Sequence, residues 1–371
     1  MDMDMHYYGT YAMARAAGLN AETALTIATA AEFVDDSTET EVYVHPDGAR
    51  FQGEATAHHP TELKPINDLD DQILVWVPFH FLPGGIGTSQ SQRLVCRKDS
   101  PIAQEMVSHA LDLSDRPYAA ELLGITAHVY ADTFAHYGFS GVSSRLNRVD
   151  GESLKAHNND PMATSMFEQR LNTFMAKFGV QGGLVKNFRS RLLSGGAEIV
   201  SGALGHGAVA TFPDQPYLEW SYGYEMADLW GAGWRVERAN ADDFIEGARA
   251  LHGMFREFAT RRPDLSDGKG GYDFDQLAPT VRALVTLIAH RDARITAWKK
   301  RAAEGAFSRD GVEALSDYDH RPWRDQAQAL KTLPEPSAAL ELPVYRFHLA
   351  AAIHRNFVLR DLLPQHGIVV V

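Results

Sequence analysis

The sequence predicts an all-α protein, a mainly α-helical bundle with long irregular loops, and three segments carry this prediction. An alanine-rich run from Tyr7 to Val34 is interrupted at Gly18, and its small side chains would let helices approach closely. A second helical pattern extends from Pro117 to Tyr137. Residues 242–261 form the clearest amphipathic pattern, in which apolar side chains share one side: Phe244, Ala248, Leu251, Phe255 and Phe258.

The other elements follow in chain order. Ser100 and Pro101 suit the N-cap and first position of a helix that continues through His109. Residues 37–100 contain short β-like or irregular pieces, such as EVYVH and ILVWVPFHF, and residues 141–160 read as a polar loop. Further helices are expected at 162–178, 184–193, 279–303 and 345–362. We predict one domain over residues 1–371, in which 1–260 carry the site and 261–371 are packing helices.

Composition excludes several classes of protein. The 371 residues include 35 Lys and Arg against 48 Asp and Glu, a formal charge of −13 that would repel a nucleic-acid backbone. We therefore expect no binding of nucleic-acid duplexes. The single cysteine, Cys96, rules out an intramolecular disulfide and a thiolate metal cage. The N-terminus lacks a signal-peptide pattern, and the most apolar stretch, residues 73–87, is shorter than the ~20 residues of a membrane span. We expect a cytoplasmic protein without a transmembrane segment.

The segment HVYADTFAH carries the strongest chemical pattern. His128, Asp132 and His136 are spaced by four, so they share one face of the predicted helix. The two histidines would lie about 12 Å apart along the axis, with the aspartate about 6 Å from each. One ion would not reach both histidines, whereas a carboxylate between them can bridge two ions roughly 3.5–4 Å apart. The spacing therefore favours a multinuclear metal site.

The alternative is a polar helix face whose histidines are satisfied by neighbouring groups. Ala127, Ala131 and Ala135 flank the polar residues, which indicates that this helix is buried. Buried imidazole and carboxylate groups need partners, and a metal ion supplies them.

Other candidate ligands come from separate parts of the chain. His6 precedes the first helical run, and Asp35 and Asp36 follow it, at a C-terminal position where acids are unfavourable without a cation. His80 lies in the apolar run PFHFLPG, where a structural histidine is the usual explanation. His206 lies between two glycines, and Asp214 follows eight residues later. The predicted ligands are His6, Asp36, His80, His128, Asp132, His136 and His206.

Two predictions concern the remaining polar and aromatic residues. Asp35 or Asp214 is expected to be the catalytic residue, a general base that orients the attacking water. The aromatic segment from Trp220 to Tyr224 is expected to wall the substrate pocket. No nucleotide-binding loop, nucleophile elbow or HExxH motif is present, which leaves metal-assisted chemistry.

The blocks HYYGTY, VDDST, PFHFLPG and HVYADTFAH resemble those of a bacterial family of unknown function, over most of residues 1–260. The chain is more distantly similar to the zinc-dependent phospholipase C and P1 nuclease superfamily, which is all-helical and holds three zinc ions. That resemblance implies ligand roles for His128, Asp132 and His136, and for Asp35 or Asp36. The chain departs from it because those enzymes are secreted and use an N-terminal tryptophan, whereas the first tryptophan here is Trp76.

The sequence thus predicts a metal-dependent hydrolase, with two or three ions, Zn²⁺ or else iron, that activate a water molecule. The expected substrate is a small-molecule or lipid phosphoester. One alternative is an HD-type di-iron oxygenase, because His and Asp ligands on helices also suit iron. The other is a non-catalytic helical interaction protein whose histidines serve packing or a partner surface.

Overall fold

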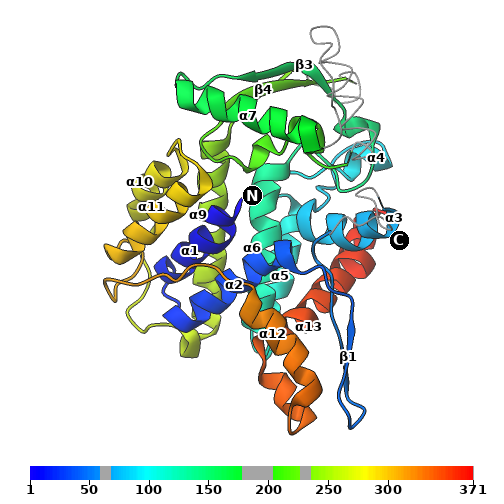
Figure 1. The fold of residues 1–371 in the computed structure, drawn as a ribbon, viewed down its shortest axis with the longest axis vertical. Coiled ribbons are helices and arrows are strands. Elements are labelled where there is room, and N and C mark those ends of the chain that lie inside the picture. The colour runs from blue at the N-terminus through cyan, green and yellow to red at the C-terminus, as the bar shows by residue number, and fades with distance from the viewer. Residues whose placement is uncertain (59–67, 178–203, 226–234, 371) are drawn as a thin grey trace.

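The computed structural model describes residues 1–58, 68–177, 204–225 and 235–370 (Figure 1). The predicted helix at 184–193 lies outside the described residues. The α-helices of the described residues, and the helices with wider π-helical turns, are η1 Asp4–Gly9, α1 Thr10–Ala16, α2 Ala21–Asp36, α3 Leu69–Asp71, η2 Gln72–His80, α4 Gln90–Arg93, α5 Pro101–Asp112, α6 Ala119–His136, α7 Pro161–Lys177, α9 Asn240–Arg261, α10 Phe274–Val285, α11 Arg291–Ala303, α12 Arg321–Ala329, α13 Pro343–Asn356, η10 Phe357–Leu362 and α14 Leu363–Gln365.

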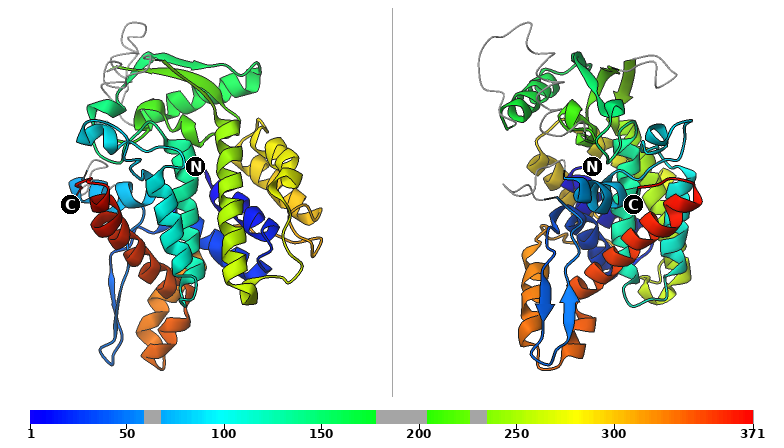
Figure 2. Two further views of the ribbon diagram at one scale, coloured as in Figure 1. Left: turned by 180° about the vertical axis from the view of Figure 1, so that it is seen from behind. Right: turned by 90° about the vertical axis from the view of Figure 1, so that its right-hand side faces the viewer.

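Helices α2, α6 and α9 form the centre of the molecule. Helix α6 packs against α2, α9, α5 and α13, and its side chains from Leu122 to His136 are all buried. Figure 2 shows α6 and α9 side by side, with α10 and α11 outside α9. The break predicted at Gly18 separates α1 from α2, where Asn20 caps α2 by accepting from the Thr23 N–H at 2.9 Å. The described helices are each too short or too polar to span a bilayer.

The prediction of an all-α fold is wrong, because the chain also forms two antiparallel sheets. Strands β1 (Val42–Val44) and β2 (Arg50–Gln52) form a hairpin. Strands β3 (Val149–Ala156), β4 (Glu219–Tyr224) and β5 (Arg235–Ala239) form a second sheet in the order β3-β4-β5, at one end of α6 and α9 (Figure 1).

The second sheet has no local signature in the sequence. Strand β4 is buried at five consecutive positions, so it lacks the alternation of a half-exposed strand. Its partner β3 begins at Val149, which pairs with Tyr224 across more than sixty intervening residues. The polar loop expected at 141–160 therefore contains a strand, and the aromatic segment expected at the pocket is the central strand.

Two other segments differ from the prediction. Residues 72–80 are helical, not β-like: the Asp68 side chain caps α3 by accepting from the Asp71 N–H at 3.0 Å, and the helix continues directly into η2. The helix expected at 279–303 is divided into α10 and α11. Helix α10 begins before Pro279, because Asp273 and Gln276 form a capping box there.

Candidate metal centre

The candidate centre is built on the buried face of α6. His128, Asp132 and His136 point to the same side, and each is at most 4% exposed. The Asp132 Oδ2 atom lies 3.3 Å from His128 Nε2 and 3.4 Å from His136 Nδ1. The predicted placement of a carboxylate between two histidines along one helix is therefore what the structure contains.

Close packing of α2 on α6 brings the first helical run to this face. A Cβ added at Gly124 of α6 would lie 2.4 Å from the Ile27 carbonyl oxygen and 2.6 Å from Ala30 Cβ of α2. The glycine thus allows the two backbones to approach. His128 Nδ1 hydrogen-bonds the Ala31 carbonyl at 2.8 Å, and Asp35, one turn farther along α2, reaches the same site.

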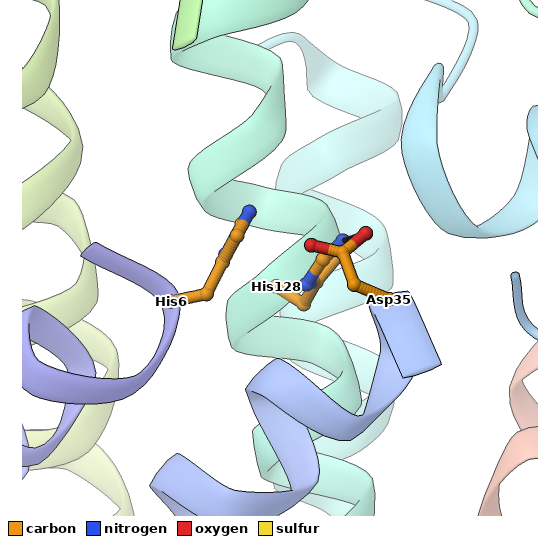
Figure 3. Close-up of side chains that lie close together, drawn as sticks. All are labelled: His6, Asp35 and His128. Atoms are coloured by element: carbon orange, nitrogen blue, oxygen red, sulfur yellow. Dashed lines mark ion pairs between the residues drawn. The ribbon is translucent and has the colours of Figure 1, made fainter. Parts of the chain in front are cut away.

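Three other segments contribute the remaining side chains. His6 of η1 stacks on His128 with ring centroids 3.8 Å apart, and Figure 3 shows it opposite Asp35 beside α6. His80, at the end of η2, lies 3.7 Å from Asp132 through its Nδ1 atom. His206 directly precedes the single turn η4 (Gly207–Val209), and Asp214 is the last residue of the single turn η5 (Phe212–Asp214).

Three groups of potential ligands result, and within each group the ligand atoms lie within 4.8 Å of one another. The first two share His128, and contacts between Asp132 and His136 connect the second group to the third. The groups are His6–Asp35–His128, His80–His128–Asp132 and His136–His206–Asp214.

Backbone carbonyls set the orientation of three of the histidines. His128 Nδ1 donates to Ala31 O at 2.8 Å, His80 Nε2 to Thr56 O at 2.8 Å, and His136 Nδ1 to the carbonyl of His80 at 2.7 Å. A carbonyl only accepts, so the proton of each neutral imidazole is on that nitrogen. The other nitrogen then presents a lone pair to the centre, as in metal-binding histidines.

This arrangement leaves a position that requires positive charge. His128 Nε2 and His80 Nδ1 face one another at 3.3 Å, and two lone pairs at that distance repel unless a cation lies between them. Burial alone would lower the pKa of His80, but the carboxylates of Asp132 and Asp35 raise it. A proton or a metal ion is therefore favoured at this point.

Several buried polar atoms at the centre make no hydrogen bond within the described chain. They are both ring nitrogens of His6, Asp132 Oδ2 and His206 Nδ1. His6 Nε2 lies 3.2 Å from Asp132 Oδ1 without forming a hydrogen bond to it. Unpaired buried groups are costly, and their concentration here fits a site for metal ions.

The electrostatics of the centre favour ionised Asp132 and Asp214 and neutral His6 and His206. Burial would raise the pKa of Asp132, but His136, the Met1 amine and His128 hold it well below its usual value. Burial lowers the pKa of His206 to about 3, although Asp214 opposes this effect. The Met1 amine donates to Asp132 Oδ1; burial opposes its charge, yet Asp132 and Asp214 raise its pKa to about 11. Ionised carboxylates and neutral imidazoles are the forms of these side chains that bind a metal ion.

The loop that carries His206 and Asp214 has a strained corner. Ala210 and Thr211 adopt the left-handed conformation, with φ of 50° and 55°, which is unfavourable for residues other than glycine. Arg170 of α7 supports this corner: its Nε donates to Ala210 O at 3.0 Å and to Thr211 Oγ1 at 3.1 Å. Thus a helix outside the centre holds the third group in place.

Some predicted residues lie elsewhere. Asp36 is outside all three groups, and its Oδ2 accepts from the Tyr318 hydroxyl at 2.7 Å. The two candidates for the catalytic base both lie in ligand groups: Asp35 beside His128, and Asp214 with its Oδ1 atom 3.0 Å from His136 Nε2. Trp220 and Tyr222 are fully buried in the core, where Trp220 packs against Phe212, and neither lines the cavity beside His206.

Sequence reasoning missed Phe81 and Arg170. Phe81 stacks on His136 with ring centroids 4.7 Å apart and contacts His206 at 5.4 Å. Its signal was its place beside His80 in the run PFHFLPG. Arg170 has no local signal, because its role depends on a corner forty residues later.

The fold and site together define a mainly helical protein with a buried His and Asp centre. The chain belongs to the family of unknown function DUF6765, whose model matches residues 1–362. No curated protein and no solved structure matches it. The expected likeness to the all-α phospholipase C/P1 nuclease fold is therefore wrong on two grounds: no such structure matches, and the chain contains two sheets.

Proposed function

We propose that the centre binds two or three divalent metal ions and that the protein is a metal-dependent hydrolase of phosphoesters. The observation that supports this proposal most is the convergence of the three ligand groups, with lone pairs of His80, His128 and His136 directed to the centre by backbone carbonyls. Imidazole and carboxylate ligands suit zinc, and iron is the alternative.

The eight side chains of the three ligand groups would have different roles. Asp132 lies within reach of His6, His128 and His136, so its two oxygens would bridge neighbouring ions. Asp35 is 40% exposed, whereas Asp214 is 13% exposed and bonded to His136. The more accessible Asp35 would therefore accept the proton of an attacking water, and Asp214 would remain a ligand.

Phosphoester hydrolysis suits this centre because a phosphate group carries its charge on several oxygens. Bound ions would lower the pKa of water and hold phosphate oxygens, which is the chemistry of multinuclear hydrolytic sites. The chain's own part is to supply three carboxylates and five imidazoles from η1, α6, the ends of α2 and η2, and the loop held by α7.

The test measures metal content and hydrolysis in the same preparations. Protein purified without chelator is analysed by plasma mass spectrometry and assayed with p-nitrophenyl phosphate and bis-p-nitrophenyl phosphate. We expect at least two zinc ions per chain and phosphate-ester cleavage, both lost in Asp132→Asn and both retained in His366→Ala, a change at a histidine paired with Glu105 away from the three groups.

Three results would overturn the proposal. Absence of bound metal in fresh protein would remove the site. Unchanged metal content and hydrolysis in Asp132→Asn would show that the α6 carboxylate has no such role. Iron in place of zinc, without ester hydrolysis, would favour an oxygenase.

A further inference from the structure

A cavity of about 750 Å³ lies next to the third ligand group. Its volume is within the range of pockets that enclose small molecules. The side chains of its apolar wall come from three parts of the chain: Phe81, Phe167, Leu204, Phe212, Tyr217 and Leu218. His206 also lines the cavity, so this space and the candidate metal centre share a side chain.

Phe81 links the cavity to the centre. Its ring stacks on His136, contacts His206 and also faces the cavity. A group whose oxygens bind an ion held by His136, His206 and Asp214 would therefore extend past Phe81 into the cavity. The apolar wall of the cavity would therefore lie beside the part of the ligand that is attached to these oxygens.

Two of the charged side chains that line the cavity, Arg294 and Arg170, donate hydrogen bonds to the chain, and Arg291 and Asp292 also line it. The Arg294 guanidinium, which is 1% exposed, pairs with Asp4 at 2.7 Å and with Asp2 at 2.9 Å. Arg170 donates to Ala210 O and to the Thr211 hydroxyl. Both guanidinium groups are engaged by the chain, and most of the surface that the cavity offers to a ligand is apolar.

We propose that the cavity binds an apolar ester group, so that the preferred substrates are phosphoesters of an alkyl or aryl alcohol. This inference rests on the proposed hydrolase function. In the reaction, the oxygen of water bonds to phosphorus, the bond from phosphorus to the ester oxygen breaks, and the alcohol leaves with a proton. The products are a phosphate and an apolar alcohol, which the cavity would hold until release.

Binding is tested first, without catalysis. Straight-chain alkylphosphonates from methyl to octyl are titrated calorimetrically into metal-free and zinc-loaded protein. We expect the dissociation constant to fall about fourfold for each added CH₂, equivalent to about 0.8 kcal/mol, until the cavity is filled. Because the cavity exists without an ion, this dependence on chain length should persist in the metal-free protein, although every affinity would be weaker.

Two methionines on α7 provide a matched pair of variants. Met166 lines the cavity, whereas Met162, one helical turn earlier, is 44% exposed and outside it. Met166→Trp should fill part of the space, shorten the longest chain that gains affinity, and leave methylphosphonate binding unchanged. Met162→Trp should reproduce the wild-type series.

Hydrolysis of methyl to octyl phosphate by zinc-loaded protein completes the test, with kcat/KM expected to follow the binding series. Equal binding of methyl- and octylphosphonate, or the same series in Met166→Trp as in wild type, would overturn the inference. Chain-length-dependent binding without hydrolysis of any ester would uphold the apolar site and refute the proposed hydrolase. Hydrolysis that is independent of chain length would support the hydrolase and refute the apolar site.

Discussion

Two histidine variants should differ in how much of the stability gained from zinc binding they lose. His128 belongs to two of the three groups, whereas His206 belongs to one. His128→Ala should therefore weaken zinc binding at two groups and His206→Ala at one. Each variant is compared with itself, in chelator and in zinc, so that the cost of removing a buried imidazole cancels.

The expected magnitude follows from ligand linkage. An ion at 100 times its dissociation constant stabilises the folded state by about 2.7 kcal/mol, and a 100-fold loss of affinity reduces this to about 0.4 kcal/mol. The loss is thus about 2.3 kcal/mol per group. With an unfolding entropy of about 2.1 cal/mol/K per residue, the zinc-induced rise in Tm of this 371-residue chain should shrink by about 3 °C in His206→Ala and about 6 °C in His128→Ala.

Differential scanning fluorimetry over a series of zinc concentrations measures these shifts, and plasma mass spectrometry counts the ions retained. His366→Ala, whose imidazole pairs with Glu105 at 3.0 Å, should keep the wild-type response. Equal losses in the two variants would refute the shared role of His128. A wild-type Tm that does not respond to zinc would refute the reasoning as a whole.

Three further predictions test the packing, the loop and the buried histidines. Gly124→Ala should lower the free energy of unfolding by about 1–3 kcal/mol, because the added methyl group meets the α2 backbone. Gly253→Ala, with open space around the added methyl group, should be neutral or stabilising. Urea unfolding measures both variants, and similar effects would contradict the tight contact at Gly124. Arg170→Ala should weaken zinc binding about 10–100-fold at the third ligand group only, so an unchanged zinc titration would exclude its supporting role. Burial lowers the pKa of His348 and His354 to about 4, from the ordinary 6.5, so the unfolded chain binds these protons at a higher pH than the folded chain does. The free energy of unfolding should therefore fall by about 2 kcal/mol for each histidine as the pH drops from 7 to 5. His354→Gln should reduce this dependence of stability on pH, and an unchanged dependence would contradict the role given to His354.

The choice between Asp35 and Asp36 shows where local sequence information ends. The two acids are neighbours at the end of α2, and adjacent side chains on a helix point about 100° apart. Which of them faces α6 depends on how α2 is rotated against it. That rotation is set by the contact of Gly124 with α2, between residues almost one hundred positions apart.

The sequence is enough to predict the helix with His128, Asp132 and His136 on one face, and the burial of that face, because helical spacing and flanking alanines are local properties. It also determined the break between α1 and α2 and the cap at Ser100. Three features depend on tertiary contacts instead: the β3-β4-β5 sheet, the position of Asp35 in the centre and the cavity beside His206. These features arise where segments distant in the chain meet, and the hydrogen bonds and packing that join them have no counterpart in any local pattern.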